Sequence, residues 1–183
     1  MTQLRFTNAQ QVLDAFPSLK YSVTVKPLDI EPLSYVRAVL KSELPEQSLV
    51  FCSYLMDKRD AVRWLCHVLR LPHQTLSPND LELVKLAEDW VRSPTETSRS
   101  LALAAGMADK KRSAAAWAAI AAGWSGGNMS SDDKHPVPPP AHLTAQGVSV
   151  AFNLLIAAPS KSQHIKNIEE YANIAIGLLK QKS

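Results

Sequence analysis

The sequence contains few cysteines, no long hydrophobic run and no metal-ligand spacing, and each of these features argues against a class of protein. Two cysteines among 183 residues, Cys52 and Cys66, do not make the framework of a disulfide-rich secreted domain. No C-x-x-C or H-x-x-x-H spacing occurs, so we predict no metal site and no cofactor. No apolar stretch reaches the roughly 20 residues that a membrane span requires, so membrane insertion is not expected.

An excess of one charge is also lacking. The formal net charge is +3, from 20 Lys and Arg against 17 Asp and Glu, and the two signs are interspersed. Nucleic-acid-binding proteins usually carry a basic stripe or arm, so a nucleic-acid partner is not favoured. Residues 1–16 lack the basic start and apolar run of a secretory signal, and we expect a cytoplasmic location.

The sequence does contain a succession of apolar segments with helical spacing, separated by some of its twelve prolines. Residues 18–30 include a short β-like run, but no second strand is available to pair with it, so we interpret them as extended chain. Nine segments are expected to be helical: 7–16, 30–42, 46–56, 58–71, 79–92, 95–108, 112–124, 141–158 and 161–182.

Two of these helices have clear starting signals. Ser77 precedes Pro78 and is predicted to cap one helix. Ser93 precedes Pro94 and is predicted to cap the next, with Glu96 completing a capping box. The end of the first helix adjoins the second cap, so the two helices are expected to form a tight hairpin.

Together these patterns predict an all-α fold without a sheet. We expect a compact array of about eight or nine helices, in which neighbours could form repeat-like pairs. No fixed repeat period is present, so a true solenoid is less favoured. Residues 1–183 are expected to form a single helical domain with a flexible Gly/Pro loop at 126–140.

Residues 123–127 read GWSGG, which matches the G-x-S-x-G signature of serine hydrolases. A nucleophile elbow needs a strand before the serine and a helix after it, whereas here an alanine-rich helix precedes and a loop follows. We therefore interpret Trp124, Ser125, Gly126 and Gly127 as a helix stop, with one glycine in the left-handed conformation. Trp124 is predicted to be largely buried, and Ser125 to contact backbone groups.

The loop ends in VPPP, residues 137–140. An extended proline segment of this kind can bind an aromatic groove on another protein. We favour a different interpretation, a stiff connector in which Pro138, Pro139 and Pro140 direct the chain into the following helix.

Arginine and tryptophan gather in the middle of the chain. Arg59, Arg63, His67 and Arg70 are spaced so that they line one face of a helix. Surfaces rich in Arg and Trp are typical of protein interfaces, and a plain solvated face is the alternative. The candidate partner-binding residues are Arg59, Arg63, Trp64, Arg70, Arg92 and Arg99. No catalytic residue is predicted.

Three blocks of the sequence resemble a known family. They are SLVFCSYLMDKRDAVRWLCHVLR (48–70), LAEDWVRSPTETSR (86–99), and AAWAAIAAGWSGGN (115–128) followed by VPPPAHLTAQGV (137–148). Their order and spacing are similar to an uncharacterised family of small α-helical bacterial proteins that are often encoded in type VI secretion gene clusters.

The resemblance implies a non-catalytic accessory protein, an adaptor or co-chaperone that acts in loading or assembly of a type VI secretion effector. Its expected partner is a protein: a secretion effector, its chaperone or a spike component. Two alternatives remain open. One is a small serine hydrolase that uses Ser125, and the other is a nucleic-acid-binding regulator that uses the Arg59–Arg70 face.

Overall fold

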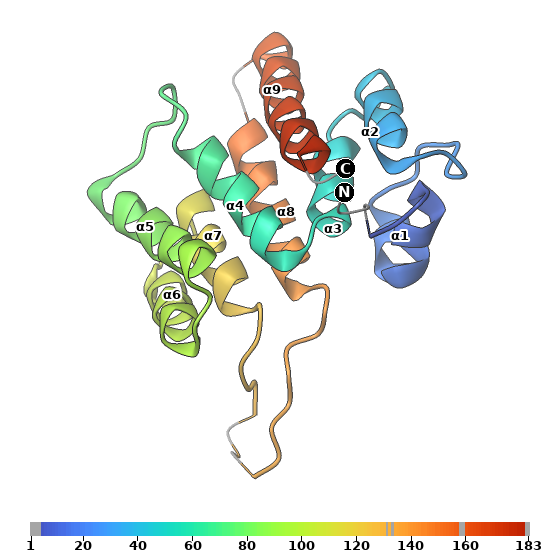
Figure 1. Cartoon of the computed structure of the whole chain (residues 1–183). Helices are drawn as coiled ribbons and strands as arrows, with labels where there is room; N and C mark the ends of the chain where they lie inside the picture. Colours follow the sequence, from blue (N-terminus) through green and yellow to red (C-terminus); the bar gives the residue numbers. More distant parts are fainter. Residues whose placement is uncertain (1–4, 131, 133, 158–159, 182–183) are drawn as a thin grey trace. The chain divides into compact units, whose positions relative to one another are not determined.

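The computed structural model describes residues 5–130, 132, 134–157 and 160–181. Within these residues the chain forms nine α-helices, one 3-10 helix and no β-strand (Figure 1), which confirms the predicted all-α fold. None of these helices is long and apolar enough to cross a membrane. The elements are α1 (Ala9–Ala15), η1 (Pro17–Tyr21), α2 (Pro32–Leu40), α3 (Gln47–Leu55), α4 (Lys58–Leu69), α5 (Pro78–Arg92), α6 (Glu96–Ala108), α7 (Ala114–Gly123), α8 (Leu143–Ile156) and α9 (Lys161–Lys180).

The chain divides into two compact units. One consists of residues 1–57 together with 155–183, and the other consists of residues 58–154. A single domain was expected for residues 1–183, and the two units are described separately below.

The first unit is built around α3, which is buried along most of its length. Phe51 packs against Tyr35 of α2, with ring centroids 4.6 Å apart, and Tyr54 meets Phe16 edge-on at 5.2 Å. Helix α9 packs against both α2 and α3. Ile168 and Ala172 are fully buried on its inner side, as expected for apolar residues spaced four apart in a helix.

The prediction of extended chain for residues 18–30 is wrong for residues 18–21. Residues 17–21 form the 3-10 helix η1, because Pro17 at its first position favours a helical φ and needs no hydrogen-bond acceptor. The rest has no helix or strand. It is held by side chains and by backbone groups. The Tyr35 hydroxyl donates to the Val25 carbonyl at 2.8 Å, and the Gln47 side chain accepts from the Thr24 N–H at 2.8 Å. The carbonyls of Leu28 and Ile30 accept from N–H groups at the start of α1.

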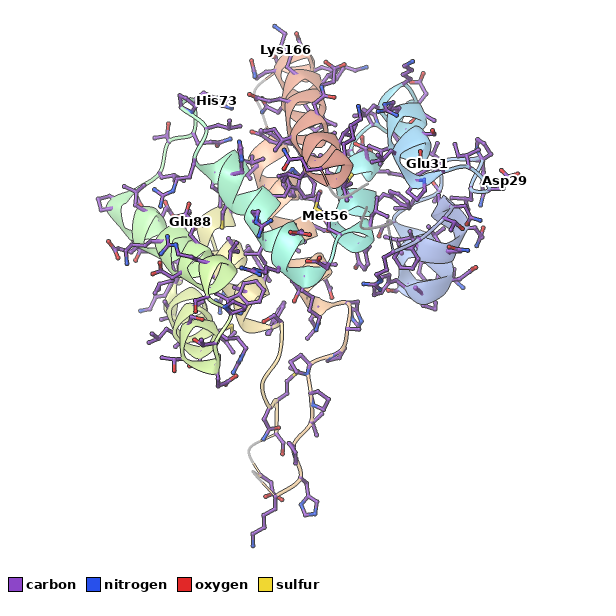
Figure 2. All side chains as sticks on the ribbon, viewed as in Figure 1. Asp29, Glu31, Met56, His73, Glu88 and Lys166 are labelled. Atoms are coloured by element: carbon purple, nitrogen blue, oxygen red, sulfur yellow. The ribbon has the colours of Figure 1, made fainter. Side chains whose placement is uncertain are left out.

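Capping side chains set the start of several helices. Ser77 caps α5 as predicted, because its hydroxyl accepts from the Asp80 N–H while the Asp80 carboxylate accepts from the Ser77 N–H. Glu31, labelled in Figure 2, caps α2 by accepting from the N–H groups of Leu33 and Ser34 at 3.1 and 2.8 Å. These bonds satisfy donors that the first turn of a helix leaves unpaired.

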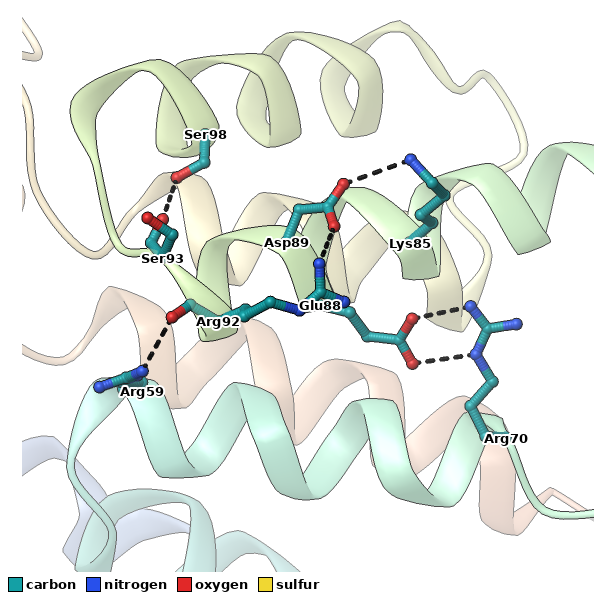
Figure 3. Close-up of polar contacts among 8 residues, drawn as sticks. All are labelled: Arg59, Arg70, Lys85, Glu88, Asp89, Arg92, Ser93 and Ser98. Carbon is teal, nitrogen blue, oxygen red and sulfur yellow. Dashed lines mark hydrogen bonds and ion pairs between the residues drawn. The ribbon is translucent and has the colours of Figure 1, made fainter.

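The predicted cap of α6 at Ser93 is wrong, because Thr95 takes that role and Ser98 completes the capping box. Ser93 belongs to the end of α5, where its N–H donates to the Asp89 carbonyl. Pro94 then forms a tight turn, in which the Thr95 N–H donates to the Ser93 carbonyl at 2.8 Å. The Ser98 hydroxyl donates to the same carbonyl at 2.7 Å (Figure 3).

The second unit surrounds α7, which contacts α4, α5 and α6. Nearly every residue of α7 is buried, as expected for a helix that is apolar on all sides. Its alanines allow close approach: the Thr144 hydroxyl of α8 donates to the Ala121 carbonyl at 3.1 Å, and Gly147 lies against the same residue. Trp64 of α4 stacks on Phe152 of α8 with ring centroids 4.0 Å apart.

Candidate protein-interaction site

The segment between α7 and α8 leaves the helices of the second unit as a long loop (Figure 1). Its base is organised by Arg99, whose side chain is only 11% exposed. The guanidinium donates to the Gly123 carbonyl at the end of α7 and to both oxygens of Glu96. These hydrogen bonds from Arg99 lower the pKa of the Glu96 carboxyl. The first turn of α6 is thereby tied to the last turn of α7.

Gly127 is required at this base for two reasons. Its φ of +88° confirms the prediction that one of the two glycines after Trp124 takes the left-handed conformation. A Cβ atom there would also overlap the guanidinium of Arg99. The helix itself ends earlier than expected, at Gly123, so Gly127 turns the loop rather than terminating the helix.

Ser125 contacts backbone and a lysine rather than a histidine. Its N–H donates to the Ala122 carbonyl at 3.1 Å, and its own carbonyl accepts from the Lys58 ammonium at 3.0 Å. Helix α7 precedes the serine and a loop follows it, which is the reverse of a nucleophile elbow. Trp124 is partly buried, neither fully covered nor exposed, and its ring meets that of Trp117 edge-on with the ring centroids 5.9 Å apart.

Further out, Asn128 ties the two arms of the loop together. Its side-chain oxygen accepts from the N–H of Ser130 and from that of Val137, both at 2.8 Å. The Met129 N–H also donates to the Val137 carbonyl at 2.7 Å. Beyond these bonds, the Asp132 carboxylate accepts from the Lys134 N–H, and residues 131 and 133 of the predicted 126–140 loop lie outside the described residues.

The tied arms expose two large apolar side chains. Met129 is 55% exposed and Val137 is 53% exposed. The neighbouring residues 134–136 and 138 are exposed as well, and Pro139 is partly covered. Pro138, Pro139 and Pro140 therefore form an extended, solvent-facing arm that leads to α8, whose first N–H, that of Leu143, donates to the Pro140 carbonyl at 3.1 Å.

The arginines predicted to contact a partner mostly bind groups of this chain (Figure 3). Arg59 donates to the carbonyls of Val91 and Arg92 at the end of α5, at 2.6 and 3.2 Å. Arg70 forms two parallel hydrogen bonds with Glu88, at 2.9 and 2.8 Å, which raise the pKa of Arg70. A guanidinium at a helix C-terminus stabilises the carbonyls that lack partners there.

The remaining candidates divide between surface and core. Arg63 pairs with Asp60 at 3.1 Å and Arg92 with Asp89 at 3.0 Å, and both arginines stay accessible. The expectation that Trp64 lies on a contact surface is wrong, because it is fully buried. Its position in α4 points into the unit, where Phe152 covers it.

Sequence reasoning missed Asn128 and Met129. The Asx-type bond from Ser130 to Asn128 is local and typical of asparagine in a loop, so it could have been found. The bond from Val137 joins residues nine apart, and nothing in the sequence pattern indicates it.

Comparison with models of known protein families shows which family the chain belongs to. A family model matches residues 35–179. The chain belongs to DUF6931, a family of unknown function. This agrees with the predicted resemblance to an uncharacterised family, and the matched range extends beyond both ends of the blocks at 48–148. No curated protein and no solved structure matches the chain. Among the described residues of this DUF6931 member, no group of three or more His, Cys, Asp or Glu side chains could hold a metal ion.

Proposed function

We propose that this DUF6931 protein is a non-catalytic accessory protein, an adaptor or co-chaperone, that binds a partner protein through the loop between α7 and α8. The observation that carries the proposal is the exposure of Met129 and Val137 on arms that Asn128 holds together. Exposed loops on a rigid scaffold are common sites of recognition. The pinning by Asn128 limits the conformational entropy that binding would remove.

The hydrogen bonding of the loop indicates what kind of contact its proline arm can make. Prolines have no N–H group, and the N–H and carbonyl of Val137 are already bonded to Asn128 and Met129. The arm therefore has no donors with which to extend a β-sheet of the partner. It is suited to contacts through proline rings and apolar side chains, as in aromatic grooves that bind extended proline segments.

The resemblance to proteins encoded in type VI secretion gene clusters supports a place in that system. We infer that the partner is a secretion effector, its chaperone or a spike component. The loop would hold it during loading or assembly. Geometry at Ser125 gives no support to the hydrolase alternative, and the engagement of Arg59 and Arg70 with this chain weakens the nucleic-acid alternative.

The test is affinity capture from cells of the source organism, with quantitative mass spectrometry. The double variant Met129→Ser, Val137→Ser is expected to lose a secretion component that the wild type captures. The matched control is Tyr21→Ser, which also removes an exposed large apolar side chain, but from the other unit. It is expected to capture normally. Undiminished capture by the loop variant would contradict the role of the loop. Capture of no secretion component, with secretion unchanged in a deletion strain, would contradict the function.

A further inference from the structure

The solvent-facing side of α6 is apolar to an unusual degree. Residues 100–108, SLALAAGMA, contain no charged side chain, and within α6 only Ala102 and Gly106 are buried. Leu101 is 55% exposed and Met107 is 49% exposed. Helices on the surface of a protein normally place polar and charged residues on the side that faces water. An exposed apolar side of this kind is typical of an interaction surface.

A pocket of about 490 Å³ lies beside this surface, between α5 and α6. Its lining is mixed. Leu83 and Leu86 of α5 and Ala105 and Ala108 of α6 are its apolar residues, and the other lining residues are polar or charged: Ser77, Asn79, Asp80, Glu82, Asp109, Lys110 and Lys111. Leu101 precedes Ala105 by four residues, about one helical turn, so it lies on the pocket side of α6. Helix α6 therefore carries an exposed leucine and, on the same side, the apolar part of a mixed pocket that it shares with α5.

We propose that α6 packs antiparallel against α6 of a second copy of the chain, so that Leu101 of each copy enters the pocket of the other. A twofold axis near Ala104 places Leu101 at the level of residue 107 of the second copy, between Ala105 and Ala108. The same axis keeps the pocket side of one helix next to the pocket side of the other. In a twofold-symmetric contact the same surface of both copies meets, so the projecting Leu101 and the pocket that receives it must lie on one surface.

The charges at the ends of α6 fit the same arrangement. Glu96 is the first residue of α6, and its carboxylate, which pairs with Arg99 of its own chain, is still exposed. Lys110 and Lys111 follow the last turn, and both are exposed. Antiparallel pairing brings the lysines of one copy near Glu96 of the other, whereas parallel pairing would bring like charges together. Alanine at the centre, Ala104, permits close approach of the two helices.

The size of the contact sets its strength. A helix of 13 residues is about 20 Å long, so pairing buries less than the roughly 800 Å² per partner of a standard interface. The dimer is therefore weak and reversible. It does not involve the loop between α7 and α8, so it does not rest on the proposed adaptor function, and either can fail without the other.

Disulfide trapping with the purified chain tests the arrangement. Ala104→Cys lies near the twofold axis and is expected to form a disulfide-linked dimer under mild oxidation. Thr97→Cys is the matched control, exposed on the same side of α6. In the antiparallel pair its two copies are about 21 Å apart along the helices and do not link. The native Cys52 and Cys66 are buried and do not interfere.

Two results would overturn the proposal. Equal linking of Thr97→Cys and Ala104→Cys would indicate parallel or random encounter, and failure of Ala104→Cys to link would remove the contact. Sedimentation equilibrium of the uncrosslinked chain gives an independent measurement. Its average mass is expected to rise with concentration, and Leu101→Ser should weaken the dimer at least about a hundredfold, because each dimer loses two leucines. Leu44→Ser, another exposed leucine, should leave the mass curve unchanged. A monomer at every concentration would refute the dimer.

Discussion

Replacing Gly106 by alanine is expected to destabilise residues 58–154, although alanine is the better helix former. Helix propensity alone favours alanine by about 1 kcal/mol in the interior of a helix. A Cβ atom at Gly106 would lie 2.8 Å from Ile120 Cγ1, 2.9 Å from the Ala116 carbonyl oxygen and 3.0 Å from the Ile120 nitrogen. Two of these three atoms belong to the backbone of α7, so no side-chain rotation relieves the overlap.

The overlap is relieved only when α6 moves away from α7. Carbon atoms in contact prefer about 3.5–4.0 Å, so the shift required is about half an ångström or more. Overpacking of this kind typically costs about 1–3 kcal/mol. After the gain in helix propensity is subtracted, the net loss in the free energy of unfolding is expected to be about 0–2 kcal/mol. Gly177 provides the matched control, because a Cβ there meets nothing within 4 Å. Gly177→Ala should raise stability by about 0.5–1 kcal/mol.

Urea unfolding followed by two signals measures both variants. All four tryptophans, Trp64, Trp90, Trp117 and Trp124, lie within residues 58–154, so tryptophan fluorescence reports on the unit that contains Gly106. Far-UV circular dichroism follows the helices of both units and reports on Gly177→Ala. If Gly106→Ala stabilises the chain as Gly177→Ala does, the close packing of α6 on α7 is refuted.

Three further predictions concern charges and thiols. Arg59→Ala should lower the free energy of unfolding by about 1 kcal/mol, because two carbonyls at the end of α5 lose their donor. Arg92→Ala, the control, should change the free energy of unfolding by less than about 0.5 kcal/mol. Urea unfolding measures both variants. Burial alone would raise the pKa of the Asp80 carboxyl, but hydrogen bonds from two serines outweigh burial, so its pKa in the folded chain is below 3.8. The ionised carboxylate therefore stabilises the fold above pH 3.8, and this stabilisation is lost as the pH falls through the lower pKa of the folded chain. The stability difference between wild type and Asp80→Asn should therefore shrink on acidification, and a difference that grows would contradict this assignment. Burial raises the pKa of Cys52 to about 12 and also raises that of Cys66. A thiol reagent at mildly alkaline pH should therefore modify neither cysteine until urea is added. Prompt labelling of the folded chain would disprove the burial of the two thiols.

Local patterns were sufficient for the helices because helix formation depends mainly on neighbours within four residues. Apolar residues with helical spacing indicated each of the nine helices, and Ser77 with Pro78 marked the start of α5. The wrongly predicted helix cap at Ser93 also concerns a choice between neighbouring residues. Ser93 and Thr95 are both good capping residues two positions apart, and only the turn at Pro94 decides between them.

The candidate site could be predicted only in part. The sequence predicted that one of two glycines, Gly126 or Gly127, is left-handed, because glycine takes such a φ without a Cβ penalty, and the structure shows that it is Gly127. The loop was recognisable from its glycines and prolines. The bond from Asn128 to Val137, which ties its arms and leaves Met129 exposed, joins two positions that no periodicity relates.

By itself the sequence determined where helices form and where the chain must turn, since those choices depend on side chains a few residues apart. Only the tertiary structure decided what the arginines and Trp64 do. Arg59 reaches carbonyls 32 and 33 residues away, and Arg99 reaches one 24 residues away. A long, flexible cation looks the same in the sequence whether it faces a partner or the end of a neighbouring helix, because packing of distant segments alone brings the unpaired carbonyls within its reach.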